Sequence, residues 1–303
     1  MSTKISDYII DFLLEQKIDK TFGYIGGAVA HIYHSIDKNP NIEIINCIHE
    51  QGAGFAAEGY ARVTGKSGVA FATSGPGATN LITAIGSCYF DSVPTLFITG
   101  QVNTYEYKYD KPVRQIGFQE TDIVSIVKPI VKYAVMIDKV EDIRYELEKA
   151  YYLSQHGRKG PVLVDIPMDI QRTNADIESL KSFFDSAEYL EFKKENKTKQ
   201  DLERVVELFN NSQRPIVLIG GGVRLSNASE NLLNFISKNN IPIVYSLMGK
   251  DGVSKDYELN FRTYFRQKNS LKRLFFRVFA IVVLSLFTNI TTSLKPYFRH
   301  FWL

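Results

Sequence analysis

A single carboxylate follows an apolar run in the first fifth of the chain. Residues 42–48 are mostly apolar, and His49 and Glu50 come directly after them, before the small-residue stretch 51–62. A parallel strand here would deliver the Glu50 carboxylate at its carboxyl end, where α/β proteins bind ligands. Two interpretations stay open: an acid–base role, or a first-turn position in which Glu50 complements the helix dipole. A zinc-protease motif is excluded because position 53 is alanine.

Glycine turns form the second set of candidate residues. Residues 73–80 read Thr-Ser-Gly-Pro-Gly-Ala-Thr-Asn after an apolar run, and Gly75, Pro76 and Gly77 predict a tight turn. Glycines let a ligand approach the backbone, and the free N–H groups of a following helix can bind an anion or a polar ring. An ordinary turn between a strand and a helix is the open alternative. A similar glycine turn lies at 23–28, and a polar cluster lies at 117–122.

The hydrophobic pattern predicts the elements that would bring these candidates together. Short apolar runs predict strands at 42–48, 69–73, 95–99 and 161–166. Helical patterns cover 5–16, 52–64, 78–89 and 141–155. Strands that alternate with helices predict an α/β fold with a parallel sheet.

Changes in composition predict the domain organisation. The first α/β domain is expected over residues 1–171, and the polar, charged stretch 172–199 predicts a linker. Strands at 215–219 and 241–246 and a helix at 228–239 predict an incomplete Rossmann-like central domain over 200–261.

The remaining tail, residues 262–303, differs from everything before it. It contains eight Lys or Arg, no Asp or Glu, and ten aromatic residues. Removing its eight charges from the net +3 leaves −5 on residues 1–261, so no nucleic-acid partner is indicated. We expect an aberrant, frameshift-like end that is poorly ordered or loosely docked. Its apolar run 278–287 is shorter than the ~20 residues that cross a bilayer, so no membrane association is expected, with a membrane-tethered binding module as an alternative.

Compartment signals point to the cytoplasm. Cys47 and Cys88 lie in apolar-rich stretches and predict reduced core thiols. The first residues show no basic segment followed by an apolar core, so no signal peptide is expected.

Taken together in chain order, the motifs are more specific than any one of them. They lie at 23–28, 49–62, 73–80, 91–94, 99–102, 118–122 and 157–167. This series resembles the pyrimidine-binding domain of acetolactate synthases and related thiamine-diphosphate enzymes, and the resemblance covers about residues 5–260. It implies a parallel-sheet pyrimidine-binding domain followed by the start of a central domain.

The resemblance implies a catalytic role for Glu50. In the family the matching carboxyl group hydrogen-bonds N1′ of the aminopyrimidine of thiamine diphosphate and promotes the tautomer whose 4′ nitrogen takes the C2 proton of the thiazolium. A carboxyl group in an apolar pocket can share a proton in this way, while the cofactor itself carries the reaction. The other positions implied around the cofactor are Gly26, Gly27, Ala28, Thr73, Gly75, Pro76, Asn80, Ser92 and Gln119.

Further positions are implied for substrate and flavin. Lys132 matches a lysine beside the substrate channel, and Phe118 lies in the substrate region. The positions implied for FAD are Arg158, Gly220, Gly221 and Gly222. Leu225 stands where a full dinucleotide fingerprint has its last glycine, so whether FAD binds stays open.

Three departures from the family pattern limit what the resemblance implies. Ile25 replaces the usual proline, and the stretch 103–114 is longer than in biosynthetic acetolactate synthases, which leaves the acceptor substrate open. No Gly-Asp-Gly occurs in the chain, so Mg²⁺ and the diphosphate would bind to a domain outside it. We assign no metal ligand here and expect the chain to contact only the pyrimidine end.

These observations predict part of an acetolactate synthase-like transferase of branched-chain amino acid biosynthesis, inactive alone. The implied reaction is decarboxylation of a 2-keto acid and ligation of the product to a second carbonyl compound. The expected partners are a second copy of the chain or a complementing C-terminal fragment. The alternatives are a carboligase acting on a keto sugar, a 2-keto acid decarboxylase, and a non-catalytic remnant or binding subunit.

Overall fold

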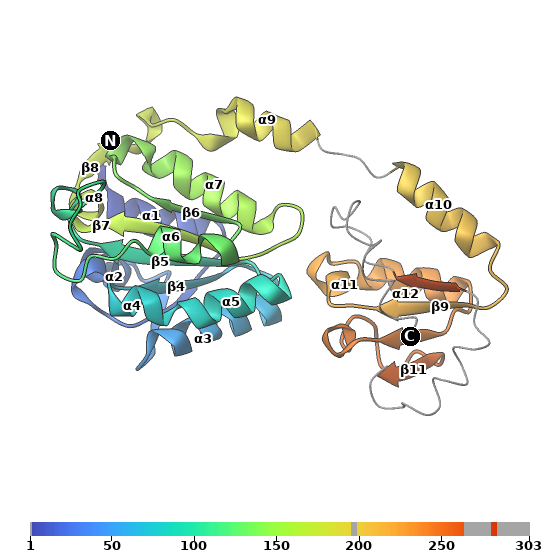
Figure 1. Ribbon diagram of the computed structural model, residues 1–303. Coiled ribbons are helices and arrows are strands. Elements are labelled where there is room, and N and C mark those ends of the chain that lie inside the picture. Colours follow the sequence, from blue (N-terminus) through green and yellow to red (C-terminus); the bar gives the residue numbers. More distant parts are fainter. Residues whose placement is uncertain (1, 195–198, 264–279, 284–303) are drawn as a thin grey trace. The chain divides into compact units, whose positions relative to one another are not determined.

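The computed structural model describes residues 2–194, 199–263 and 280–283 and divides the chain into two compact units (Figure 1). Unit 1 comprises Met1–Lys194 and unit 2 comprises Glu195–Leu303. No described helix is long and apolar enough to cross a membrane.

Unit 1 is built on a six-stranded sheet of order β3-β2-β4-β5-β7-β6, in which every pairing is parallel. The strands are β2 (Lys20–Gly23), β3 (Glu43–Asn46), β4 (Gly68–Ala72), β5 (Thr95–Gln101), β6 (Tyr133–Met136) and β7 (Val162–Pro167). The α/β fold and the parallel sheet predicted from the sequence are confirmed. The four predicted strands correspond to β3, β4, β5 and β7, whereas β2 and β6 were not anticipated.

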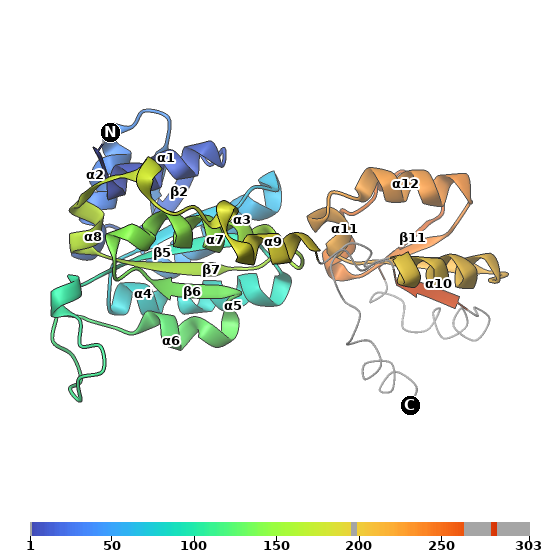
Figure 2. The same ribbon diagram turned by 90° about the horizontal axis from the view of Figure 1, so that it is seen from above.

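Helices cover both faces of this sheet (Figures 1 and 2). One face packs against α1 (Ile5–Glu15), α2 (Ala30–Lys38), α7 (Ile143–Gln155) and α8 (Met168–Arg172). The other packs against α3 (Glu50–Thr64), α4 (Pro76–Asn80), α5 (Ile82–Asp91) and α6 (Ile123–Val127). Side chains alternate along the central strands, so that Phe71 and Ile98 enter the first core while Ala70 and Phe97 enter the second. Strands buried on both faces explain why their sequences are continuously apolar.

The small residues of α3 allow it to approach its neighbours closely. A Cβ on Gly54 would lie 2.5 Å from the Cβ of Ala84 in α5, and a Cβ on Gly68 in β4 would lie 2.0 Å from the carbonyl oxygen of Ala57. The predicted single helix 78–89 is instead two helices, α4 and α5, joined at Leu81. These contacts hold α3 against α5 and against the start of β4.

Most of the stretch predicted to be a linker is part of unit 1. β8 (Asn174–Asp176) pairs antiparallel with β1 (Ser2–Lys4), and it is followed by η5 (Ile177–Ser179), η6 (Phe183–Asp185) and α9 (Ala187–Lys194). Phe183 is fully buried. The polar composition of this stretch was misleading because its polar groups are satisfied by α7.

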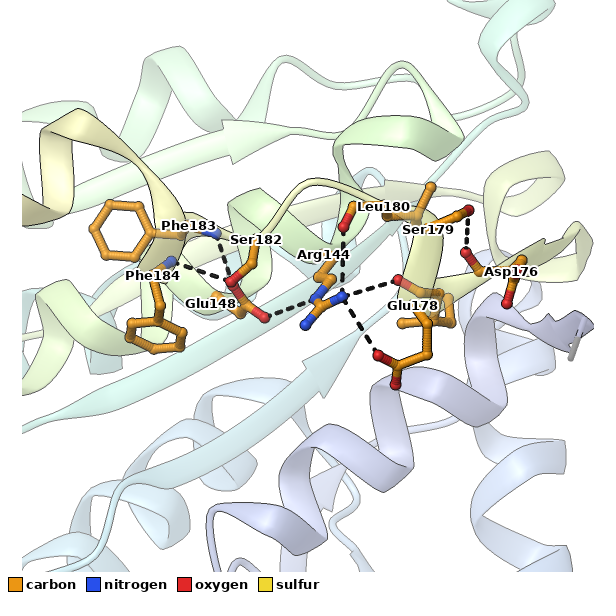
Figure 3. A network of polar contacts seen from close by, with 10 residues as sticks. Arg144, Glu148, Asp176, Glu178, Ser179, Leu180, Ser182, Phe183 and Phe184 are labelled. Carbon is orange, nitrogen blue, oxygen red and sulfur yellow. Dashed lines mark hydrogen bonds and ion pairs between the residues drawn. The ribbon is translucent and has the colours of Figure 1, made fainter.

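A network of polar contacts holds this stretch on α7 (Figure 3). The buried Glu148 carboxylate accepts hydrogen bonds from the Ser182 hydroxyl at 2.7 Å and from the Phe183 N–H at 2.8 Å. Arg144 donates to the Glu148 carboxylate at 3.0 Å and to the Ile177 carbonyl at 3.1 Å. Because breaking a buried charged network of this kind is costly, residues 176–186 are an integral part of the domain.

Unit 2 is smaller. Its strands, β9 (Pro215–Ile219), β10 (Ile243–Tyr245), β11 (Asn260–Thr263) and β12 (Ala280–Val283), form a parallel sheet of order β11-β10-β9-β12. Its helices are α10 (Lys199–Asn210), α11 (Gly222–Leu225) and α12 (Ser229–Lys238). A core that includes Val217, Ile236 and Ile243 joins β9, α12 and β10. β12 lies within the tail that we expected to be outside the fold; the rest of 264–303 lies outside the described residues.

Candidate functional site

The Glu50 carboxylate lies at the carboxyl edge of the unit 1 sheet. Glu50 is the first residue of α3, it follows β3, and only 8% of its surface is exposed. Its Oε2 accepts a hydrogen bond from Nδ2 of Asn80, at the end of α4, at 2.9 Å. The capping bond of α3 is made by His49 instead, whose Nδ1 accepts from the Gln51 N–H at 3.2 Å. Glu50 is therefore directed away from its own helix and towards a second one.

The glycine turn before α4 packs against this carboxylate. Gly77 has no Cβ, and a Cβ there would lie 3.1 Å from Oε1 of Glu50 and 2.7 Å from Cγ2 of Thr73. Gly75 has φ 62°, which only glycine adopts readily. The predicted tight turn is present, and it leaves Oε1 of Glu50 without a hydrogen bond to any described residue.

The turn at residues 26–28 joins the same site. The Ala28 N–H donates to Oγ1 of Thr73 at 3.1 Å, and a Cβ on Gly26 would lie 2.4 Å from Cβ of Thr73. Thr73 therefore connects two glycine turns that are 45 residues apart. Gly27 begins the short helix η1 (Gly27–Val29), and a Cβ on it would meet nothing within 4 Å.

Gln119 flanks the turn from a third segment, and Phe118 precedes it in the chain. A Cβ on Gly75 would lie 2.7 Å from Cβ of Gln119 and 2.9 Å from its carbonyl oxygen. Gln119 itself has φ 60°. Phe118 is 82% exposed. Glu50 and Gln119 thus lie on two sides of one glycine turn.

One residue of this edge was missed by sequence reasoning. The Tyr33 hydroxyl is buried without a hydrogen-bond partner among the described residues, and a Cβ on Gly23 would lie 2.6 Å from it. Burial raises the pKa of Tyr33, and the nearby Cys47 and Glu50 raise it further. A buried unsatisfied hydroxyl calls for an explanation such as a bound polar group, and a tyrosine inside an apolar helix pattern gave no signal of it.

Comparison with known proteins identifies the two units. Residues 3–126 match the family model of the thiamine pyrophosphate enzyme N-terminal TPP binding domain, and residues 202–273 match that of the thiamine pyrophosphate enzyme central domain. The chain belongs to the thiamine pyrophosphate enzyme family. Thiamine pyrophosphate and thiamine diphosphate are the same molecule, so the family expected from the motifs is confirmed.

The curated proteins to which this chain is similar are acetolactate synthases. The chain is 38% identical to the acetolactate synthase large subunit of Buchnera aphidicola over 248 residues, which are 80% of this chain and 42% of the relative. The large subunit of Haemophilus influenzae is 39% identical over 80% of this chain and 41% of the relative. The chloroplastic acetolactate synthase of Arabidopsis thaliana is 38% identical over 85% of this chain and 37% of the relative. The chain therefore spans about two fifths of the length of these relatives.

Three of the residues implied by the family lie at the opposite edge of the TPP binding domain. Ser92 precedes β5, Lys132 precedes β6 and Arg158 precedes β7, which places them at the amino ends of the parallel strands. The Arg158 Nε donates to Oγ of Ser92 at 2.7 Å. Within one chain the structure therefore does not bring Ser92 or Lys132 to the Glu50 site.

Lys132 has a structural environment that sequence reasoning did not anticipate. Its Nζ donates to the carbonyl of His156 at 2.6 Å and also to that of Leu153, at the end of α7. Burial lowers the pKa of Lys132 to about 8. The ammonium group thus satisfies carbonyls at the helix C-terminus, a favourable place for a cation.

The glycines implied for FAD lie in the central domain, at the carboxyl end of β9. A Cβ on Gly220 would meet nothing within 4 Å, while one on Gly221 would lie 3.2 Å from the Met248 carbonyl oxygen. Gly222 begins α11. Among the described residues no group of three or more His, Cys, Asp or Glu could hold a metal ion.

Proposed function

We propose that unit 1 binds the aminopyrimidine end of thiamine diphosphate, with Glu50 as the acid–base group. The observation that carries the proposal is the state of the Glu50 carboxylate, which is buried and oriented through Oε2 by Asn80, while Oε1 has no hydrogen-bond partner among the described residues. A ring nitrogen with a shareable proton fits that free oxygen, and the bare surface of Gly77 leaves room for it. The unsatisfied Tyr33 hydroxyl on the same edge also fits a polar ligand.

The residues of this chain would then bind, orient and exchange a proton. Thiamine diphosphate supplies, when bound, a thiazolium carbon that attacks 2-keto acids. Glu50 would hold and move the proton at Oε1, Asn80 would orient the carboxylate through Oε2, and Thr73 with Gly26 and Gly75 would shape the protein surface beside that carboxylate. The exposed Phe118 offers an apolar contact to the substrate.

We further propose that the complete enzyme makes acetolactate from a 2-keto acid, because the similar curated proteins carry that name. Mg²⁺ and the diphosphate would bind to a domain outside these residues. The residues proposed to contact FAD are Arg158 in unit 1 and, separately, Gly220, Gly221 and Gly222 in unit 2. The ordered loop of residues 103–120 would set the acceptor. Analysis of the products from pyruvate, with and without a keto sugar, distinguishes acetolactate synthesis from simple decarboxylation and from transfer to the sugar.

A second copy of the chain is the proposed partner. The outer surfaces of α3 and α5 and the loop before α3 expose large apolar side chains, namely Ile48, Phe55, Val63 and Phe90. Large exposed apolar side chains gathered on neighbouring helices favour an interaction site, and most soluble oligomers pair identical subunits. The two free cysteines, Cys47 and Cys88, fit a reducing compartment such as the cytoplasm.

The test is Glu50→Gln in the chain complemented by the C-terminal part of the Haemophilus influenzae relative. Acetolactate formation should fall by about 10²–10⁴-fold, as for the loss of a positioned acid–base group. Glu43→Gln is the matched control, because Glu43 lies on the preceding strand with its carboxylate exposed and paired with Lys20. Equal activity of Glu50→Gln and Glu43→Gln would reduce Glu50 to a structural residue.

A further inference from the structure

The segment 116–121 is held in place by a buried carboxylate that has no assigned role. Glu120 is 8% exposed. Its Oε2 accepts hydrogen bonds from the N–H groups of Ile116 at 2.7 Å and Gly117 at 3.2 Å, and its Oε1 accepts from the Lys108 N–H at 2.9 Å. No lysine or arginine side chain among the described residues pairs with it. Three backbone donors therefore converge on one charged side chain, an arrangement whose hydrogen bonds are stronger than neutral ones.

The far end of the same segment is held from the sheet. Nε2 of Gln101 on β5 donates to the Thr121 carbonyl and to Oδ2 of Asp165 on β7, both at 2.8 Å. The Thr99 hydroxyl donates to Oδ1 of Asp165 at 2.7 Å. Asp165 therefore orients Gln101, and Gln101 holds the carbonyl of Thr121.

Between these two anchors lies the contact with the glycine turn. A Cβ on Gly117 would lie 2.7 Å from Cγ1 of Val102, so the segment rests on the end of β5. Gln119 has φ 60° and meets Gly75, which has φ 62°. Two backbones with positive φ lie against each other, and this conformation is easy for Gly75 but unfavourable for Gln119 in isolation.

We propose that Glu120 is a positioning residue that holds Gln119 against the Gly75 turn, and through that turn keeps the surface beside Glu50 ready for the pyrimidine ring. The identity of the ligand rests on the proposed function, whereas the coupling between Glu120 and the glycine turn does not. Glu120 touches neither the turn nor the ligand position; it acts by closing the loop 108–117 that leads into Gln119.

The first measurement is amide hydrogen exchange on the full chain carrying Glu120→Gln. The variant keeps the shape of the side chain but points an N–H₂ group at backbone donors. Exchange should rise at Lys108, Ile116 and Gly117, and also about tenfold at Thr79, because the Thr79 N–H donates to the Gly75 carbonyl at 3.1 Å and is protected only while the turn is held. Glu106→Gln is the matched control, since Glu106 accepts from the Asn103 N–H at 3.1 Å in the same loop. It should raise exchange near residue 103 alone.

The second measurement is calorimetric titration of each chain with thiamine diphosphate. Glu120→Gln should bind about tenfold more weakly than the unchanged chain, as expected for the loss of about one charged hydrogen bond's net contribution, and Glu106→Gln should bind equally well. Absence of binding by the unchanged chain would contradict the proposed function, and the exchange data would then decide the positioning role by themselves.

Three results would overturn the inference. Exchange at Thr79 that equals that of the unchanged chain would confine Glu120 to its own loop. A binding affinity that is unchanged while Thr79 exchanges faster would separate the turn from the ligand. Loss of protection throughout β4 and β5 would make Glu120 a residue of general stability rather than of position.

Discussion

Two glycine turns in this chain occupy the same place in two different domains and have opposite surroundings. Gly75 to Gly77 follow β4 and lead into α4, and Gly220 to Gly222 follow β9 and lead into α11. A Cβ on Gly75 would collide with Gln119, whereas a Cβ on Gly220 would meet nothing within 4 Å. Gly75 has a positive φ, and none of the three later glycines does. The backbone is therefore crowded around Gly75 in one domain, whereas the position of a Cβ on Gly220 is open in the other.

The buried side chains of the two domains also differ, in their polarity. Within the described residues, all buried polar or charged side chains belong to unit 1, between Ser6 and Ser186. Asp165, Gln101 and Glu120 lie among them, below the first turn. Since buried polar groups fix geometry only when they are satisfied, unit 1 is built to hold its turn in one shape. The core of unit 2 that supports the second turn is apolar.

The largest effect that this comparison predicts is for Gly75→Ala. The new Cβ would force either a strained residue at φ 62° or a shift of the Gln119 backbone, whose oxygen lies 2.9 Å away. Strain and overpacking together should lower the free energy of unfolding of unit 1 by about 3 kcal/mol. Hydrogen exchange of the β4 amides measures this for unit 1 alone. Protection in β4 that matches the unchanged chain would show that the crowding is easily relieved.

A smaller effect is predicted at Asp165, through pH. Burial raises the pKa of Asp165 to about 7, although hydrogen bonds from Thr99 and Gln101 oppose the shift. Between pH 4 and 7 the folded state then keeps a proton that the unfolded state has lost, so stability from this group falls as pH rises. The loss from pH 5 to 7 should be about 2 kcal/mol.

The check is to compare the unchanged chain with Asp165→Asn by denaturant unfolding across this pH range. The variant cannot ionise at this position and should have a flatter profile, while an exposed control, Asp110→Asn, should follow the unchanged chain. Parallel profiles for Asp165→Asn and the unchanged chain would mean that Asp165 is already ionised in the folded state at pH 5.

The smallest effect is predicted for Gly220→Ala, the counterpart of the first variant. With no atom near the new Cβ and no positive φ, the free energy of unfolding of unit 2 should change by less than about 0.5 kcal/mol. Exchange of the β9 amides is the measurement. A loss comparable to that of Gly75→Ala would remove the distinction between the two turns.

Much of the fold was readable from the sequence, because strands buried on both faces are unmistakably apolar. β4, β5 and β7 lie within two residues of the predicted runs. β2 escaped notice because it is four residues long and contains Lys20 and Thr21, of which Thr21 is buried by its neighbours rather than by its own character. Residues 174–194 were mistaken for a linker because their polar groups find partners on α7, which composition does not reveal.

The site was readable in part, and only through the combined motifs. Glu50 and Asn80 meet across 30 residues, and both positions were implied by the resemblance. The sequence did not indicate that Lys132 reaches the carbonyls at the end of α7, more than twenty residues away. The sequence also did not show that Gln119 lies beside the glycine turn while Ser92 lies at the opposite edge of the sheet. That difference depends on the order of the strands, which is a tertiary property.

The antiparallel pairing of β1 with β8 has a consequence for the use of this domain as a module. Ser2 lies opposite Asp176 and Lys4 opposite Asn174, so residues 2–4 lie beside the segment that follows β7, the last strand of the six-stranded sheet in chain order, and helix α8. Adjacent ends are what make circular permutation and insertion into a host protein tolerable. A short peptide could join residue 176 to residue 2, and new ends could be opened in an exposed turn such as that at Lys66. This permuted chain should preserve the six-stranded sheet. Residues 177–194, which pack on α7, would need to be supplied as a separate peptide.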